Sequence, residues 1–187
     1  MVKKIKTCVF ISGNGSNLKS IIKSSRESNF PISVKLIISN NKLAKGLLIG
    51  KKYDIPYKYF SSENKTNFER NYLNELKKHK IKFICLAGFM KLISNNFIKK
   101  FNNKIINIHP SLLPKYKGLN THKRVLKRKE KYSGCTVHFV SDKLDSGKII
   151  SQKRIFIKKD ETVKSLKKKI LRQEHLLYSK SIISIFR

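Results

Sequence analysis

An amide and an imidazole stand two residues apart near the middle of the chain, at a spacing that suits joint chemistry. Asn107 and His109 close the apolar, β-branched run Lys104–His109, which has the pattern of a buried strand. A period of two directs both side chains to the same side of that strand. They could stabilise an oxyanion and supply a proton, and Pro110 and Pro114 stiffen the loop that follows. The same pair could equally cap backbone groups, and the spacing leaves both interpretations open.

Two of the eleven acidic residues fall in one short loop, at 141–147, directly after the apolar run 137–140. A carboxylate there could face His109 at the edge of a sheet and keep the imidazole protonated for acid catalysis. The spacing of Asp142 and Asp145 before a glycine is also typical of an ordinary turn, which is the commoner interpretation. The loop therefore offers candidate carboxylates without assigning them a role.

A glycine-rich segment, GNGSN at 13–17, follows the first apolar run and opens a helical pattern. Glycines there let the backbone approach a phosphate, and the N–H groups at a helix N-terminus favour an anion. The dinucleotide fingerprint fails because Leu18 stands where its third glycine belongs, and a Walker lysine is absent. A mononucleotide-like sugar phosphate fits better, although a plain strand-to-helix turn remains the alternative.

A fourth segment, LAGFMKLI at 86–93, again leaves a strand-like run. Its apolar side chains and accessible backbone amides suit a flat heteroaromatic ring. On spacing alone, ordinary core leading into a helix explains the segment equally well.

The elements that must position these residues follow from hydrophobic periodicity. Strands are expected at 5–12, 34–39, 56–60, 83–87, 104–109, 135–140 and 149–157, and helices at 18–25, 44–53, 68–79, around 97–101, and at 162–186. This alternation predicts an α/β fold with an open, mostly parallel twisted sheet and helices on both faces. Ligands of such sheets bind at the carboxyl ends of the strands, where all four motifs fall. The length fits one domain, 1–187.

The net charge of +32 is the most unusual feature of the composition. A charge of this size normally indicates nucleic acid or an anionic membrane as a partner. The 43 basic residues are 36 lysines spread along the chain and only seven arginines, however, and arginine is preferred for phosphate and base recognition. A codon bias towards lysine, asparagine and isoleucine explains the excess as well, so nucleic acid is not expected as the main partner.

Cysteine usage and apolar runs indicate the compartment. The three cysteines, Cys8, Cys85 and Cys135, are far apart and form no C-x-x-C pair, which favours reduced thiols and neither a disulfide framework nor a zinc site. The N-terminal apolar run is too short for a signal peptide, and no run is long enough to cross a bilayer. The sequence therefore predicts a soluble cytoplasmic protein.

Taken together, the segments ISGNGSNL, LAGFMKLI, NIHPSLLPKYKG, VHFVSDKLDSG and LRQEH, in this order, resemble the single-domain phosphoribosylglycinamide formyltransferase family of the folate-dependent formyltransferase superfamily. The resemblance runs from Ile5 to about Tyr178. It implies a Rossmann-like formyltransferase fold with a phosphate-binding N-terminal half and a folate-binding, catalytic C-terminal half. It also implies transfer of the formyl group of 10-formyltetrahydrofolate to the amine of N1-(5-phospho-D-ribosyl)glycinamide in purine biosynthesis, with no metal, small-molecule partners only, and a monomer or weak homodimer.

The resemblance also implies roles for individual residues. The catalytic set would be Asn107, His109 and Asp145. The substrate would be bound by Gly15, Ser16, Asn17, Arg172, Gln173 and Glu174, with Glu174 at the glycinamide end. The folate would contact Lys65, Met90, Lys91, Leu92, Ile93, Asn107, Ser141, Asp142, Lys143, Leu144 and Asp145.

The chain departs from the family pattern at three positions. Lys65 stands where an arginine is common near the folate tail, and loses the planar fork of that side chain. Lys117 replaces a proline and Asn120 a histidine in the loop after the catalytic strand. Methionyl-tRNA formyltransferase and formyltetrahydrofolate hydrolase share this chemistry, but they carry extra domains for which the chain is expected to have no room.

Overall fold

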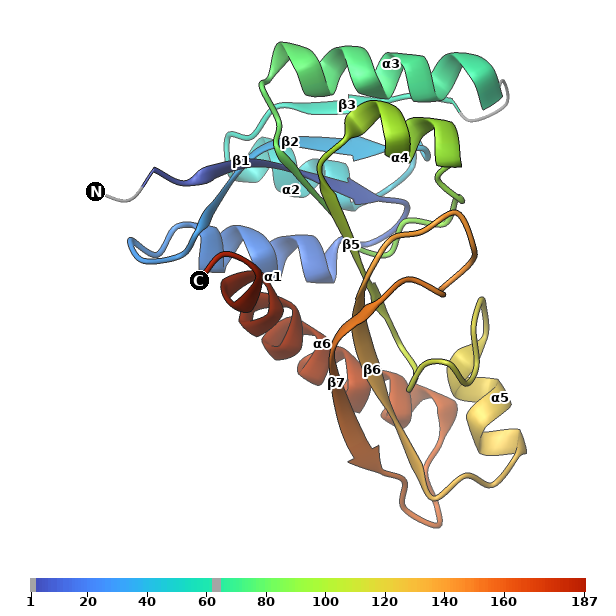
Figure 1. Ribbon diagram of the computed structural model, residues 1–187. Coiled ribbons are helices and arrows are strands. Elements are labelled where there is room, and N and C mark those ends of the chain that lie inside the picture. Colours follow the sequence, from blue (N-terminus) through green and yellow to red (C-terminus); the bar gives the residue numbers. More distant parts are fainter. Residues whose placement is uncertain (1–2, 62–64) are drawn as a thin grey trace. The chain divides into compact units, whose positions relative to one another are not determined.

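The computed structural model describes residues 3–61 and 65–187, apart from the side chains of 65–68. The chain packs as two compact units, one comprising residues up to Ile106 together with Phe186, the other Asn107–Ile185 and Arg187. The described elements, labelled in Figure 1, are β1 (Ile5–Ile11), α1 (Ser16–Ser25), β2 (Ile32–Ser39), α2 (Gly46–Lys52), β3 (Tyr57–Tyr59), α3 (Lys65–Lys78), β4 (Phe83–Leu86), α4 (Asn95–Phe101), β5 (Lys104–His109), α5 (Thr121–Lys127), β6 (Tyr132–Phe139), β7 (Ile149–Phe156) and α6 (Val163–Ile185).

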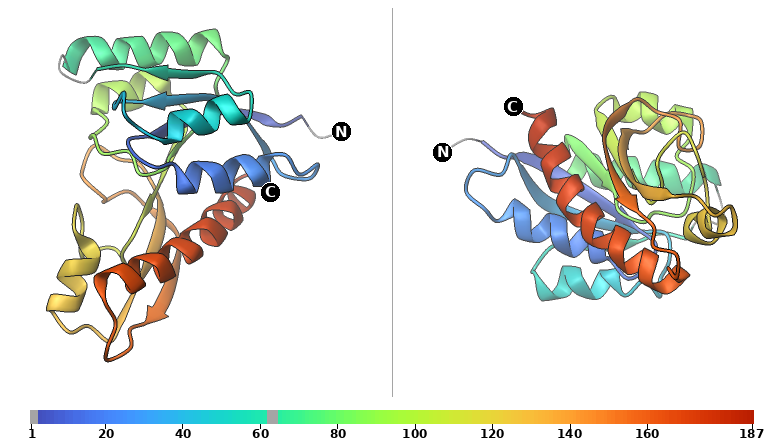
Figure 2. Two further views of the ribbon diagram at one scale, coloured as in Figure 1. Left: turned by 180° about the vertical axis from the view of Figure 1, so that it is seen from behind. Right: turned by 90° about the horizontal axis from the view of Figure 1, so that it is seen from below.

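The first unit is a parallel sheet between two layers of helices. Strands β1, β2, β3 and β4 pair in parallel, in the order β3-β2-β1-β4. Helices α1 and α2 lie on one face of these strands and α3 and α4 on the other (Figure 2). Because both faces are covered, β4 is buried throughout and β1 is buried from Thr7 onwards. Phe10 packs edge-to-face against Tyr72 of α3 and Phe97 of α4, which joins the sheet to one helical layer.

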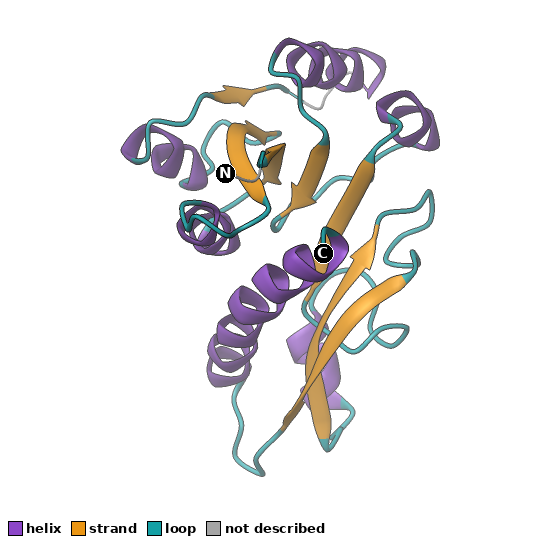
Figure 3. Cartoon of the chain, turned by 60° about the vertical axis from the view of Figure 1, so that its left-hand side comes forward, coloured by secondary structure: helices purple, strands orange, loops and turns teal. Residues whose placement is uncertain are grey.

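The second unit is built on an antiparallel pair and one long helix. Strands β6 and β7 pair antiparallel, and α6 packs against both of them (Figure 3). Helix α6 buries one stripe of residues four apart, a spacing that keeps them on one face: Leu166, Ile170, Glu174, Tyr178 and Ile182. The helix α5 contacts α6.

The sequence predicted the fold class correctly. The strand order is β3-β2-β1-β4-β5-β6-β7, an open and mostly parallel sheet, and every predicted strand and helix is present with ends shifted by a few residues. Helix α5 was not predicted. It is short, and Thr121 and Val125 are its buried residues, so its periodicity is weak. Among the described helices, none is both long and apolar enough to span a bilayer. The single domain at 1–187 stays a prediction.

Candidate active site

A histidine–aspartate pair lies at the carboxyl end of β5. His109 is the last residue of that strand, and its Nδ1 lies 3.3 Å from Oδ2 of Asp145. The two side chains are only 7% and 8% exposed. The same carboxylate oxygen accepts a hydrogen bond of 2.8 Å from the backbone N–H of Gly118. Of the two candidate carboxylates in the loop, Asp145 therefore faces the imidazole, whereas Asp142 is exposed.

The second ring nitrogen of His109 also faces an acceptor. Its Nε2 lies 2.9 Å from the carbonyl oxygen of Tyr116. A carbonyl oxygen only accepts, so Nε2 carries a proton, and the Asp145 carboxylate at Nδ1 favours a proton there too. The ring of His109 is thus held between a carbonyl oxygen at Nε2 and a carboxylate oxygen at Nδ1, at the end of β5.

Asn107 is oriented by a histidine to which the sequence analysis gave no role. His138 on β6 is buried, its Nδ1 lies 2.8 Å from the carbonyl oxygen of Phe139, and its Nε2 lies 3.3 Å from Nδ2 of Asn107. Burial lowers the pKa of His138, although the Phe139 carbonyl and Asp145 act in the opposite direction. A neutral ring with its proton on Nδ1 accepts at Nε2 from the Asn107 amide. One N–H of that amide then remains for a ligand.

His138 also lies next to Asp145, since its Nε2 is 3.8 Å from Oδ1 of that carboxylate. The three residues predicted to be catalytic, Asn107, His109 and Asp145, thus converge within the second unit. The signal for His138 in the sequence was weak, since a histidine in an apolar strand is more often part of the core.

The loop after β5 is held to the β6–β7 pair by side-chain hydrogen bonds. Thr136 on β6 donates to the carbonyl of Ser111 at 2.7 Å and accepts from the N–H of Leu113 at 3.1 Å. Gln152 on β7 donates to the Leu113 carbonyl and to Thr136, both at 2.8 Å. These bonds anchor Ser111 and Leu113, at the start of the loop that also carries the Tyr116 carbonyl.

The glycine-rich turn in the first unit is built by the backbone. Gly15 stands at the N-cap of α1 with φ +74, and a Cβ there would lie 2.8 Å from the Cα of Gly46. The Gly46 N–H also donates to the Gly13 carbonyl at 3.0 Å. Glycine is therefore needed at 15 both for its conformation and for the close approach of α2. Gly15 makes no side-chain cap at the start of α1, and the N-terminus of a helix favours an anion.

Ser12 ties this turn to two other loops of the first unit, a role that the sequence did not suggest. Its hydroxyl donates to Oδ1 of Asn40 at 2.6 Å and accepts from the N–H of Met90 at 2.8 Å. The Ser12 carbonyl accepts from Nδ2 of Asn41 at 3.0 Å. The segments after β1, β2 and β4 therefore form one rim, which includes the start of the predicted folate segment. Met90 and Leu92 are 62% and 61% exposed there.

The remaining predicted residues lie as follows. On α6, Glu174 is buried, Gln173 is half-buried and Arg172 is exposed. Gly15 and Asn17 are buried and Ser16 is half-buried at the start of α1. Ile93 is buried and Lys91 exposed, and in the Asp145 loop Ser141 is half-buried while Lys143 and Leu144 are exposed. Of the departures, Lys117 donates to the Ser146 hydroxyl and Asn120 stands at the N-cap of α5. The side chain of Lys65 lies outside the described residues.

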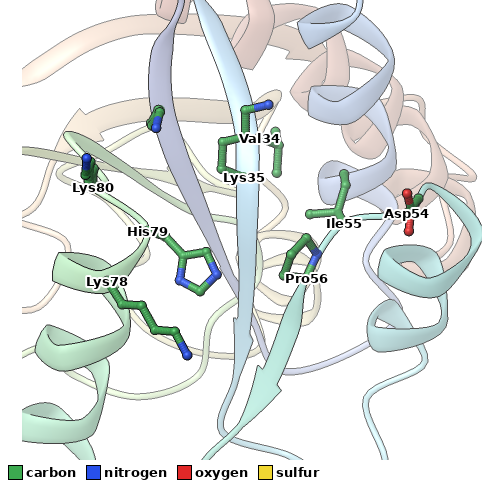
Figure 4. Close-up of a pocket in the computed structure, with 9 residues that line it drawn as sticks. Val34, Lys35, Asp54, Ile55, Pro56, Lys78, His79 and Lys80 are labelled. Atoms are coloured by element: carbon green, nitrogen blue, oxygen red, sulfur yellow. The ribbon is translucent and has the colours of Figure 1, made fainter.

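A separate pocket of about 440 Å³ lies at the opposite rim of the first unit (Figure 4). It is lined by Lys6 and Lys35 near the amino ends of β1 and β2 and by Lys78 and Lys80 at the end of α3. It contains none of the predicted site residues. Within 3–61 and 65–187, no group of three His, Cys, Asp or Glu side chains is placed to hold a metal ion.

Comparison with known protein families shows the family of this chain. The model of the family described as formyl transferase matches residues 5–182. The chain belongs to the formyl transferase family. Its relatives in that family include phosphoribosylglycinamide formyltransferases, the group that the sequence motifs predicted.

Three relatives of this formyl transferase illustrate the similarity. It is 37% identical over 176 residues to phosphoribosylglycinamide formyltransferase of Bacillus subtilis, covering 92% of this chain and 90% of the relative. It is 38% identical to the human trifunctional purine biosynthetic protein adenosine-3, covering 94% of this chain but only 18% of that protein. The crystal structure of the Brucella melitensis phosphoribosylglycinamide formyltransferase matches with a TM-score of 0.93 at 35% identity, covering 98% of this chain and 96% of that one.

This formyl transferase thus spans less than a fifth of the multi-domain animal relatives and nearly all of the bacterial ones. The solved structures are similar along the whole fold, so both units are of the formyltransferase type.

Proposed function

We propose that this chain transfers the formyl group of 10-formyltetrahydrofolate to the amine of N1-(5-phospho-D-ribosyl)glycinamide, giving the N-formyl product and tetrahydrofolate in de novo purine biosynthesis. The observation that carries the proposal is the buried His109–Asp145 pair at 3.3 Å, with Asn107 oriented beside it through His138. A buried imidazolium, a carboxylate and an amide donor are what a formyl transfer through a tetrahedral oxyanion requires.

In the first step, the glycinamide amine attacks the formyl carbon, and the carbonyl oxygen takes the negative charge. The free N–H of Asn107 donates to that oxyanion. The Nε2–H of His109 is engaged by the Tyr116 carbonyl in the resting arrangement. His109 therefore acts mainly through its positive charge, which a site of low dielectric leaves largely unscreened. Stabilisation of this kind by one good donor lowers a barrier by about 3–4 kcal/mol.

In the second step, the tetrahedral intermediate collapses and the bond from carbon to N10 of the folate breaks. The proton lost by the attacking amine must reach N10, which becomes the N–H of tetrahydrofolate. Asp145 is the base that relays this proton, through a water molecule, and its contact with His109 holds the carboxylate in place at the end of β5. Every atom and proton is then accounted for without a metal or a covalent enzyme intermediate.

Substrate binding is assigned by the same proposal. The phosphate and ribose are held by Gly15, Ser16 and Asn17 at the N-terminus of α1, where N–H groups and the helix dipole favour an anion. The glycinamide end contacts Glu174 on α6, with Arg172 and Gln173 beside it in sequence. The folate contacts Lys65, the segment Met90, Lys91, Leu92 and Ile93, and the loop residues Ser141, Asp142, Lys143, Leu144 and Asp145. The exposed Met90 and Leu92 provide apolar surface for a pteridine ring. The partners are small molecules, and the enzyme is cytoplasmic.

The test is a spectrophotometric assay of tetrahydrofolate formation from 10-formyltetrahydrofolate, with and without glycinamide ribonucleotide. Product formation that depends on the ribonucleotide supports the proposal. Equal formation in its absence would indicate hydrolysis of the formyl-folate, and no formation in either case would contradict the assignment. A parallel assay with methionyl initiator tRNA as the acceptor tests the alternative, in which the formyl group is transferred to methionyl-tRNA.

A further inference from the structure

Tyr116 is the residue through which a distant carboxylate reaches the candidate catalytic histidine. Its carbonyl oxygen accepts from Nε2 of His109 at 2.9 Å and from the Ser111 hydroxyl at 3.3 Å. Its backbone has the left-handed conformation, with φ +59, and the residue is 8% exposed. A non-glycine residue in this region holds its place only when its surroundings determine it strongly. The position of the carbonyl therefore depends on what holds the side chain.

The side chain of Tyr116 is held by a cluster of charges on and after α5. Its phenol donates to Oε1 of Glu130 at 2.7 Å, and the same oxygen accepts from Lys115 at 3.1 Å. The guanidinium groups of Arg124 and Arg128 lie 5.5 and 5.7 Å from the centre of the tyrosine ring. These distances are within the range of cation–π attraction. Three charged side chains, Glu130, Arg124 and Arg128, thus contact the Tyr116 side chain, and Lys115 pairs with Glu130.

The pKa shifts of Tyr116 and Glu130 agree with a hydrogen bond in which the phenol is the donor and the carboxylate the acceptor. Burial and the bond to Glu130 raise the pKa of the Tyr116 phenol, and the bond from that phenol, together with Lys115, lowers the pKa of Glu130. The phenol stays a donor and the carboxylate an acceptor over the neutral pH range, so the link is a stable one.

We propose that Glu130 is a positioning residue for the transfer reaction: through the Tyr116 phenol it sets the carbonyl that fixes the imidazole of His109. The proposal rests on the proposed function and extends it to a residue that touches neither substrate. Glu130 itself reaches His109 only through Tyr116. A side chain with this role changes the rate of the chemical step and leaves substrate affinity alone, because the imidazole moves while the binding segments do not.

The first experiment compares Glu130→Gln and Tyr116→Phe with the unmodified enzyme in the formyl-transfer assay. We expect kcat to fall about fivefold in each, since small displacements of a catalytic group are costly, with KM for both substrates changed by less than about twofold. The double variant should lose no more activity than the more impaired of the two single variants, because both changes weaken the same link. Glu161→Gln is the matched control: this carboxylate pairs with Lys169 in the same unit and has no link to Tyr116.

The second experiment follows the imidazole directly and does not depend on activity. In [15N]histidine-labelled full-length protein, the His109 signals are assigned from their loss in His109→Gln. We expect the Nε2 resonance of His109 to shift in Glu130→Gln and in Tyr116→Phe, and to be unchanged in Glu161→Gln. Loss of stability with unchanged kcat and an unmoved Nε2 resonance would reduce Glu130 to a structural role and overturn the proposal. If the unmodified protein has no transferase activity but the resonance shifts, the proposed function fails and the positioning link stands.

Discussion

The glycine-rich turn at 13–17 and the cluster at the end of β5 lie in different units. The first is formed by backbone and the second by side chains. The turn at 13–17 is made by backbone: Gly15 has a left-handed conformation, and a Cβ at this position would lie only 2.8 Å from the Cα of Gly46. The cluster at the end of β5 is made by side chains, with His109, Asp145 and Asn107 linked through His138. A substitution in the turn should therefore act through folding, whereas one in the cluster should act through chemistry.

The largest effect is expected where the charge pair is broken. Asp145→Asn and His109→Ala should each lower kcat by about two to three orders of magnitude, the range for loss of a main electrostatic contribution. Both proteins should remain folded, because Thr136 and Gln152 still hold the loop after β5 to β6 and β7. Steady-state kinetics and circular dichroism together test this. Asp160→Asn, an exposed carboxylate in the loop after β7, is the control and should keep full activity. Near-normal turnover in either variant removes that residue from the mechanism.

The next largest effect is expected in the turn. Gly15→Ala places a Cβ against the Gly46 backbone and forces a positive φ, so we expect a loss of about 3 kcal/mol in the free energy of unfolding. Urea unfolding measures it. Gly13→Ala is the matched control, because a Cβ there meets nothing within 4 Å and its stability should be unchanged. If both variants unfold alike, the close approach of α2 is not what selects glycine at 15.

The half-buried His122 on α5 should contribute to the loss of stability at acid pH. Burial, with the charges of Lys167 and His109, lowers the pKa of His122 from 6.5 to about 4. Its Nδ1 has no hydrogen-bond partner among the described residues. Since the unfolded chain binds the proton more readily, stability is lost as pH falls from 6.5 to about 4, by about 2 kcal/mol for this partly exposed ring.

The measurement is the free energy of unfolding against pH for the unmodified protein and for His122→Gln. The variant should show a shallower decline over that window. Parallel curves for the two proteins would mean that His122 is protonated in the folded state as easily as in the unfolded one.

The smallest effect is expected at the side chain that links the loops of the first unit. Ser12→Ala removes the hydroxyl that joins Asn40 and Met90, and should cost about 1–2 kcal/mol of stability. Ser28→Ala, at an exposed serine after α1, serves as the comparison, and a change in Ser12→Ala should exceed the change there. Equal changes in Ser12→Ala and Ser28→Ala would show that backbone alone holds this rim, which would sharpen the contrast with the second unit.

The sequence by itself determined the elements and the family. Strand and helix periodicity is local, so β1 to β7 and most of the helices could be predicted from it, and the period of two placed Asn107 and His109 on one side of β5. The motifs predicted the family that the comparisons show. Helix α5 was not predicted because few of its residues are buried, so its periodicity is weak. Asn120 stands at its N-cap position, but its side chain makes no capping hydrogen bond.

Only the tertiary structure decided which groups meet. It selected Asp145 over Asp142 as the partner of His109, and it brought the Tyr116 carbonyl, His138 and the Ser12 hydroxyl to their places. The partners in these contacts stand up to 78 positions apart in the chain, on loops whose approach is set by strand pairing and helix packing. A local pattern states what a residue can donate or accept. The folding of distant segments onto one strand end decides which partner it finds.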